Sequence, residues 1–405
     1  MNRIRNILVL VLLVLILLNL NGVGYVFFDL LGIFKFVYLF IIVILFFSTP
    51  IFTKYNSQFL WLSFFLILYL IFGIFATFIF GSFVEIFDKI ISIIISIALN
   101  ILFVNLFIKA KLSGNFSSIL KKIYWLALFS SLSGLLITIS GLYAYGNYKA
   151  GEGRISGFFA NPNELGLMIN FAISMTLFYI LKKQSLKYIV FYFVLLYASV
   201  YTFSKASIIT SLLITFLFLF YISLSKSHLV LRYKVYVISI ISAVVIMWFS
   251  ESIMSNWSID QVHRITQTFR LLNGEIDSES TTGRSGLYQY GIQKIKSNPL
   301  IGYGIGTFSR FKEYELGIGS HNAFLLIIGE AGAIPFIFFL FNYFKLLVTT
   351  YLNQLIKERF IIYAISISLI IYFMGTHGVF HSRFVILFLS LITVMANSKT
   401  IEIKD

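Results

Sequence analysis

Long apolar runs dominate the chain and constrain its fold more than any other feature. A helix needs about 20 apolar residues to cross the hydrocarbon core of a bilayer, and about twelve such runs alternate with short polar segments. They are predicted near residues 4–20, 33–49, 59–80, 90–108, 121–143, 162–181, 187–203, 206–224, 235–250, 322–344, 360–375 and 382–396. Only the segment "SKAS" separates the seventh run from the eighth.

The composition excludes a soluble globular fold, because it cannot supply a water-exposed surface. Only 12% of the residues are charged, against about a quarter in soluble domains. The chain has no Cys, which excludes disulfides, thiolate metal sites and a Cys nucleophile. Its five His show no HExxH spacing, so no metal site is expected. We predict an all-α polytopic membrane protein with about twelve transmembrane helices, forming a single membrane domain over residues 1–405.

The distribution of Lys and Arg in the short loops predicts the orientation. Basic segments such as "KAKLSGNFSSILKK", "LKKQSLK" and "SKSHLVLRYK" fall on one side of the predicted spans. This side is expected to be cytoplasmic, together with both chain termini. The first run follows Arg3 and Arg5 as in a signal peptide, but "NLNG" offers no small-x-small cleavage site, so a span is predicted there. The net charge of +15 is then explained by the basic cytoplasmic loops of a membrane protein, and no nucleic-acid partner is expected.

Residues 251–320 form the longest segment between two predicted spans, the ninth and the tenth, and are expected to be a large extracytoplasmic loop with short helices. One external helix is predicted to begin near Arg284 and end before Pro299. Its apolar face would hold Leu287, Tyr288, Gly291 and Ile295. The following "GYGIG" is expected to be a flexible connector.

Several cations lie on the outer side, against the charge bias: Arg154, Lys205, Arg264, Arg270, Arg284 and Arg310. Arginine binds phosphate with two parallel hydrogen bonds, so the set indicates an anionic ligand at the membrane surface. For any single arginine, pairing with an acid of the same loop, such as Glu275, is the alternative. For Lys205 the alternative is a lysine that extends to the membrane interface.

The segment "GRISGFFANPNELG" is typical of the start of a helix. Asn161, Pro162 and Glu164 have the spacing of an N-cap, a first-turn proline and a capping-box acid for the sixth span. Arg154 lies just before this helix start, where free N–H groups favour anions. This position suits an arginine that binds phosphate.

The segment "SHNAFLLIIGEAGAIP" combines a polar start with an apolar run. With Ser320 as N-cap, His321 and Asn322 would occupy the first turn of the tenth span. An imidazole, with an ordinary pKa of about 6.5, can take a proton from a hydroxyl at neutral pH. A solvated histidine at the helix end is the alternative, and His377 and His381 compete for the same role.

The same segment continues with Glu330 and Pro335. On one continuous helix Glu330 would face away from His321, so we predict a buried carboxyl that is neutral or hydrogen-bonded to a neighbouring helix. Pro335 is expected to kink the span.

Together these segments resemble the O-antigen ligase and polymerase family of bacterial membrane glycosyltransferases. The resemblance is carried by "GRISGFFANPNELG", "TFSKAS", "TGRSGLYQYGIQKIKSNPLIGYGIGTFS" and "SHNAFLLIIGEAG", in this order, and covers about residues 125–385. Two positions depart from the family. Lys205 stands where the family usually has Arg, and Pro335 stands where the His-Asn motif usually ends in Gly, Thr or Tyr.

The resemblance implies transfer of a glycan from a polyprenyl-pyrophosphate-linked oligosaccharide to an acceptor hydroxyl. The reaction would take place at the outer face of the cytoplasmic (inner) membrane of a bacterium. It would need no nucleotide sugar, metal or other cofactor. The resemblance also implies that Arg154, Lys205, Arg284 and Arg264 bind the pyrophosphate and that His321 is the general base. Asn322 and Glu164 would support them. The implied partners are a glycan or lipid-linked acceptor, membrane lipids, a chain-length regulator and a flippase.

Three other functions compete with polymerisation of O-antigen or capsule repeat units. A ligase would transfer the glycan to a lipid A core or to protein. A secondary transporter would have ionisable groups near the midplane between repeated halves, and only Glu330, close to Gly329, Gly332 and Pro335, fits this pattern. A non-catalytic scaffold for envelope assembly would not need the outer arginines.

Overall fold

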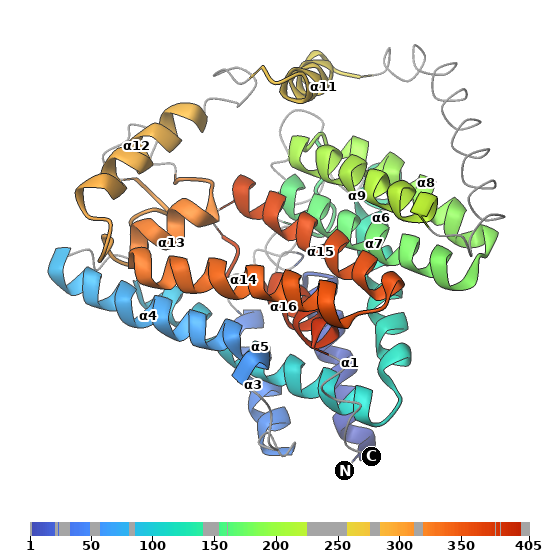
Figure 1. Ribbon diagram of the computed structural model, residues 1–405, viewed down its shortest axis with the longest axis horizontal. Coiled ribbons are helices and arrows are strands. Elements are labelled where there is room, and N and C mark those ends of the chain that lie inside the picture. The colour runs from blue at the N-terminus through green and yellow to red at the C-terminus, as the bar shows by residue number, and fades with distance from the viewer. Residues whose placement is uncertain are drawn as a thin grey trace.

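The computed structural model describes residues 2–20, 23, 33–48, 57–80, 86–140, 154–159, 161–224, 257–275, 284–311, 319–376, 378–380 and 382–397. These residues form helices and no strand. The longer helices are α1 (Asn2–Leu17), α3 (Ile33–Ser48), α4 (Trp61–Phe80), α5 (Ile86–Leu112), α6 (Phe116–Ser140), α7 (Pro162–Lys183), α8 (Leu186–Tyr201), α9 (Lys205–Leu224), α14 (Ala333–Asn353), α15 (Ile356–Gly375) and α16 (Arg383–Ala396). Shorter elements are η1 (Ser57–Phe59), α11 (Ile259–Leu272), α12 (Arg284–Ser297) and α13 (Ala323–Ala331) (Figure 1).

The all-helical, multi-span prediction is confirmed. Within the described residues, seven helices are long and apolar enough to cross a membrane: α4, α5, α6, α7, α9, α14 and α15. Shorter apolar helices, lying in α1, α3, α8 and α16, match four further predicted spans. The predicted span at 235–250 lies outside the described residues, and the total of twelve stays a prediction.

The tenth span was predicted wrongly as one helix over 322–344. The structure divides it at Gly332, whose φ of +80° interrupts the helix between α13 and α14. On one straight helix Phe324 and Phe339 would lie about 22 Å apart, but their ring centroids are 6.5 Å apart. Helix α13 therefore folds back along α14 as a hairpin (Figure 1), and α14 alone is the candidate span.

Pro335 does not produce this break. It is the third residue of α14 and is buried in the first turn, where a helix tolerates proline because the N–H has no intrahelical partner. The predicted kink at Pro335 is thus replaced by a full reversal at Gly332.

Contacts between helix ends define two opposite sides of the bundle, as expected for spans that alternate in direction. The start of α16 contacts the start of α5, because Arg383 donates to Ser92 O at 2.9 Å. At the other side of the bundle, Gln354 after α14 donates to Ala396 O at the end of α16, at 2.8 Å. Below, "loop side" means the starts of α5, α7, α9 and α16 with the ends of α4, α8 and α15; "opposite side" means the ends of α5, α14 and α16 with the starts of α6 and α8.

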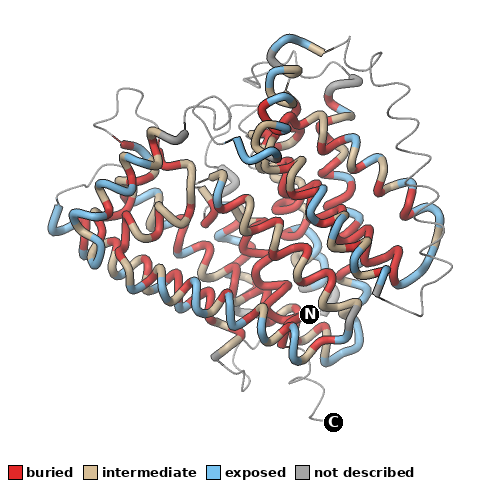
Figure 2. Tube along the Cα trace, turned by 45° about the horizontal axis from the view of Figure 1, so that its top comes forward, coloured by how far each residue is buried: buried red, intermediate tan, exposed pale blue. Residues whose placement is uncertain are grey.

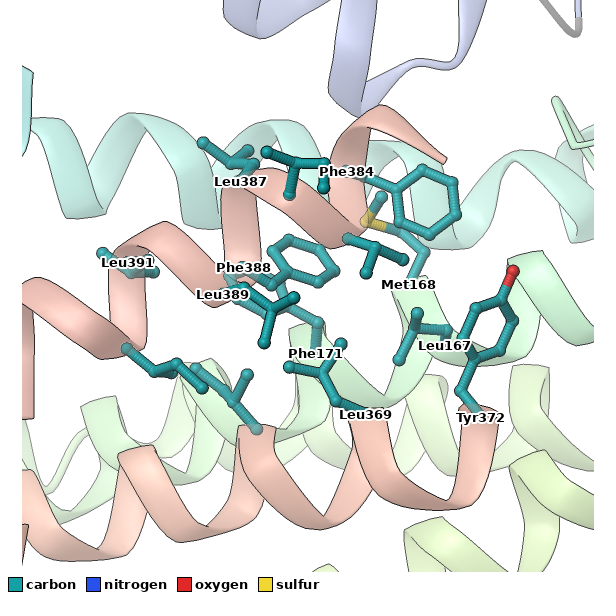
Figure 3. Close-up of a cluster of buried hydrophobic side chains, with 14 of the residues drawn as sticks. Leu167, Met168, Phe171, Leu369, Tyr372, Phe384, Leu387, Phe388, Leu389 and Leu391 are labelled. Atoms are coloured by element: carbon teal, nitrogen blue, oxygen red, sulfur yellow. The ribbon is translucent and has the colours of Figure 1, made fainter. Parts of the chain in front are cut away.

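Helix α7 lies at the centre of the bundle and packs against α6, α8, α9 and α15. Its residues from Leu165 to Leu181 are all buried, and a helix that is apolar all round is stable only inside a protein or a bilayer. Phe171 of α7 stacks on Phe388 of α16, with centroids 3.8 Å apart (Figure 3). Figure 2 shows this buried interior beneath helices with exposed outer faces.

Small and polar residues bring α7 and α9 close together. A Cβ added at Gly166 would lie 2.6 Å from Ser207 Cβ, so only glycine fits there. Asn170 Nδ2 donates to Ser207 O at 3.2 Å, and the Ser207 hydroxyl lies 2.9 Å from that of Ser199 on α8. These contacts fix the start of α9 against the first half of α7.

Candidate functional site

A cavity of about 390 Å³ opens on the loop side where α7, α9, α11, α12 and α15 meet. Three of the predicted anion-binding cations line it: Arg154, Lys205 and Arg264. Asn163 and Tyr288 also contribute polar groups, whereas the rest of the lining is mainly apolar and comprises Phe203, Ala206, Ile209, Leu271, Ile371, Tyr372, Met374 and Gly375. The cavity therefore combines cations with an apolar wall.

Arg154 is positioned by an extended segment that packs on α6. Phe158 N donates to Ser133 Oγ at 3.2 Å, and Gly157 has a φ of +58° beside Ser133, with no space for a Cβ. Arg154 Nε lies 3.5 Å from Thr202 O, after the end of α8. The arginine thus joins the start of α7 to the turn between α8 and α9.

The start of α7 has the predicted cap. Asn161 Oδ1 accepts from Asn163 N and Glu164 N, both at 3.0 Å, and Pro162 is the first helical residue. Two of the N–H groups expected to favour an anion are therefore already bonded to the cap. Glu164 is the third helical residue and is half-buried; the structure does not place it among the cavity-lining residues that it describes.

The turn between α8 and α9, which precedes Lys205, is fixed by burial and hydrogen bonds. Phe203 has a φ of +46°, which is strained for an aromatic residue, and it is buried. Thr202 Oγ1 accepts from Ser204 N at 3.1 Å, and Ser204 Oγ donates to Asn163 Oδ1 at 2.8 Å. These bonds place Lys205, the first residue of α9, beside the start of α7.

Helix α11 brings Arg264 to the cavity. A capping box formed by Ser258 and Gln261 starts the helix, and Trp257 just before it packs edge-on against Phe203, with centroids 5.4 Å apart. Further along α11, Arg270 Nε donates to Glu275 at 2.8 Å. For Arg270 the alternative of pairing with a loop acid is thus confirmed.

The helix predicted to begin near Arg284 is confirmed as α12, Arg284–Ser297, and its extracytoplasmic position stays a prediction. Leu287 and Ile295 are buried, as expected. Tyr288 OH donates to Met374 O at 3.1 Å, so α12 closes the cavity against the end of α15. Arg284 lies one helical turn before Tyr288; its side chain is outside the described residues.

His321 lies before α13 and not in its first turn. The N-cap is Asn322, whose Oδ1 accepts from Phe324 N at 2.9 Å and Leu325 N at 3.1 Å, so the prediction of Ser320 as N-cap is wrong. His321 has a φ of +46° and is half-buried. Such a φ is uncommon outside glycine and is frequent at functional sites.

His321 is not among the described residues that line the cavity, but helix α13, which follows it, packs against the same end of α15. Phe324, three residues later, packs against Phe373 with centroids 6.2 Å apart, and Phe373 precedes the cavity-lining Met374. The competing candidates His377 and His381 lie outside the described residues.

Glu330 is buried, as predicted, and holds the loop that follows α12. Its Oε1 accepts from Phe308 N at 3.1 Å, from Ser309 N at 3.2 Å and from Ser309 Oγ at 3.1 Å, and its Oε2 accepts from Tyr69 OH of α4. The carboxyl therefore joins α4, α13 and the loop.

The segment "GYGIG" is not a flexible connector. Tyr303 N donates to Gly329 O at 2.8 Å, and Gly304 N donates to Glu330 O at 3.0 Å. A Cβ at Gly304 would lie 2.5 Å from Thr77 Oγ1, so the glycines allow the backbone to pack on α4. This packing fixes the end of α13 and the reversal at Gly332.

Sequence reasoning missed two polar groups that organise the loop side. Tyr69 gave no signal within an apolar helix. Arg383 donates to Ser92 Oγ at 2.9 Å and Ser96 Oγ at 2.7 Å. The four-residue spacing of these serines, on one face of α5, is a signal that could have predicted a polar contact there.

The apolar helices are those of a multi-pass membrane protein, and its cavity combines three cations with a mainly apolar wall. A family model described as O-Antigen ligase matches residues 189–340, which contain Lys205, Arg264, Arg284, His321 and Asn322. This match supports the resemblance of the chain to the O-antigen ligase and polymerase family. A search of curated proteins found no match.

Proposed function

We propose that the protein transfers an oligosaccharide from a polyprenyl pyrophosphate carrier to an acceptor hydroxyl, and that it polymerises O-antigen or capsular repeat units. The observation that carries this proposal is the convergence of Arg154, Lys205 and Arg264 on one cavity with a mainly apolar wall. Following the charge bias of the loops, we place the loop side on the extracytoplasmic face of the bacterial cytoplasmic membrane.

The cavity suits both halves of such a donor. Arginine and lysine bind pyrophosphate oxygens through charge-assisted hydrogen bonds. The apolar wall continues from Ile209 along one face of α9 to Leu213 and Phe216, which are exposed. In a bilayer this face contacts acyl chains and gives a polyprenyl tail a path from the cavity into the membrane.

In the reaction, the acceptor oxygen attacks the anomeric carbon of the donor sugar while the bond from that carbon to the pyrophosphate oxygen breaks. The bonding electrons pass to the pyrophosphate, and fixed cations stabilise the growing charge. The acceptor proton passes to the imidazole of His321. Arg284, one turn before the cavity-lining Tyr288, is proposed as a fourth cation.

Asn322 and Glu164 would support the site from two helix starts. Asn322 caps α13 and thereby fixes the backbone directly after His321. Glu164 occupies the first turn of α7, next to Asn163 of the cavity. Neither role requires contact with the donor.

Transfer to a separate acceptor, as in an O-antigen ligase, is the second candidate, because the matching family model carries that description. The transporter alternative depended on Glu330 as an ionisable group in the membrane. Its bonds to Tyr69, Phe308 and Ser309 instead give this carboxyl a structural function.

The first experiment tests the cavity with two arginines of one helix. Arg264→Ala should lower the initial rate with lipid-linked repeat unit by about 10²-fold or more, the usual effect of removing one group that stabilises developing charge. Arg270→Ala is the matched control, because Arg270 pairs with Glu275 and is partly exposed. Equal rates for the two variants, at equal amounts of folded protein, would contradict the proposal.

The second experiment decides the acceptor. Purified protein receives polyprenyl-pyrophosphate-linked repeat unit alone, and the products are separated by length. Longer lipid-linked glycan identifies a polymerase, whereas product that forms only after addition of a lipid A core or a protein acceptor identifies a ligase.

A further inference from the structure

A second cavity, of about 470 Å³, lies on the opposite side of the bundle between α1, α3, α5 and α6. Ser92, which bonds Arg383 on the loop side, and Lys109, which lines this cavity, are both on α5. Their separation of 17 residues corresponds to about 25 Å of helix. The two cavities thus lie toward opposite sides of the helix bundle.

The lining of this second cavity is divided by polarity. Its deeper wall is apolar and comprises Val9, Leu10, Leu12, Leu13, Leu45 and Phe103, among others. Its polar part includes Lys109 near the end of α5 and Lys122 in the second turn of α6. Asn115 and Ser113 of the turn between the two helices form a polar rim, where Asn115 Nδ2 donates to Ser113 Oγ at 3.2 Å.

Asn105 provides an independent sign of a ligand. It lines the cavity one helical turn before Lys109, and it is only 3% exposed. Its Oδ1 has no hydrogen-bond partner in the part of the chain that the structure describes. A buried carboxamide oxygen without a donor costs about 1–3 kcal/mol, so a bound group that supplies a donor would stabilise the protein.

We propose that this cavity binds an anionic glycerophospholipid of the leaflet opposite the cation cavity. Lys109 and Lys122 bind the lipid phosphate, a headgroup hydroxyl donates to Asn105, and the acyl chains lie along the leucines of α1. Basic pockets between transmembrane helices commonly bind such headgroups. Charge complementarity favours this occupant over a zwitterionic lipid, and the apolar wall favours it over free phosphate.

The test uses the full-length protein in detergent, with lipid binding measured by native mass spectrometry. Phosphatidylglycerol should bind wild-type protein more tightly than phosphatidylcholine. The double variant Lys109→Gln/Lys122→Gln should lose affinity for phosphatidylglycerol by on the order of tenfold or more, as expected for two surface lysines near an anionic lipid. The control is Lys183→Gln/Lys187→Gln, which changes two exposed lysines on the same side of the bundle.

The variant Asn105→Leu separates an effect on lipid binding from an effect on the stability of the protein. It removes an unsatisfied buried oxygen, so the melting temperature without lipid should stay the same or rise. The rise in melting temperature caused by phosphatidylglycerol should shrink. Equal binding by the lysine double variant and its control, equal binding of phosphatidylcholine, or full displacement of the lipid by millimolar inorganic phosphate would each overturn the proposal.

Discussion

The bonds of Glu330 predict that this buried carboxyl is necessary for the structure of the loop side. Glu330→Ala removes the acceptor of Phe308 N, Ser309 N, Ser309 Oγ and Tyr69 OH. Phe308 and Tyr69 are buried, so their donors cannot reach water in exchange. At about 1–3 kcal/mol for each buried donor left without a partner, the loss of stability is about 2–6 kcal/mol.

The isosteric change Glu330→Gln is the matched variant. Its amide oxygen can still accept from Phe308 N and Ser309 N, and its amide N–H can donate to the Tyr69 oxygen. The expected cost is below about 2 kcal/mol. The glutamine variant keeps the volume of the side chain and removes only its charge, whereas the alanine variant removes the acceptor and the volume together.

Thermal unfolding in detergent and limited proteolysis of residues 301–311 provide the measurements. For a chain of this length, Glu330→Ala should lower the melting temperature by roughly 2–7 °C and expose the loop to protease, while Glu330→Gln should stay close to wild type. A melting temperature of Glu330→Ala within about 1 °C of wild type would refute the reasoning. So would a glutamine variant as unstable as the alanine variant, because charge and not acceptor geometry would then hold the loop.

Three further changes test other parts of the structure. Lys205→Arg should keep most of the activity, because a cation remains at the cavity, whereas Lys205→Ala should lower the rate of donor consumption about 10²-fold. Gly166→Ala should destabilise the protein by about 1–3 kcal/mol, because the new Cβ would meet Ser207 at 2.6 Å; an unchanged melting temperature would contradict the close packing of α7 and α9. Arg383→Gln should lower the melting temperature, since it removes charge-assisted bonds to α5 worth about 1.5–3 kcal/mol each, but donor binding by the folded fraction should be unchanged.

The spans could be predicted from the sequence because a bilayer requires long apolar runs, and these are visible residue by residue. The reversal at Gly332 could not. An apolar run has the same composition whether it continues or folds back, and here the bonds from Tyr303 and Gly304 to the end of α13 favour the reversal. Each of these bonds joins residues that are 26 apart in the sequence, too far for a local pattern to indicate the pairing.

The cations of the site were predictable as a set, because each stands against the charge bias of the loops. Their assembly was not. Arg154, Lys205 and Arg264 converge only because Asn163 bonds the turn before α9 and Trp257 packs on Phe203. Charge and spacing alone did not separate Arg264 from Arg270; the family resemblance did, and in the structure Arg270 pairs with Glu275, five residues away.

Binding of an unreactive donor analogue tests the central claim most directly. Polyprenyl pyrophosphate without sugar would be titrated against wild-type protein, the Arg154→Ala/Lys205→Ala/Arg264→Ala variant and the Arg270→Ala control in lipid nanodiscs. The wild type and the control should bind with the same Kd, and the triple variant should bind at least 10²-fold more weakly, a conservative value for three charge-assisted contacts. Equal affinity of the triple variant and the wild type would show that this cavity does not hold the pyrophosphate.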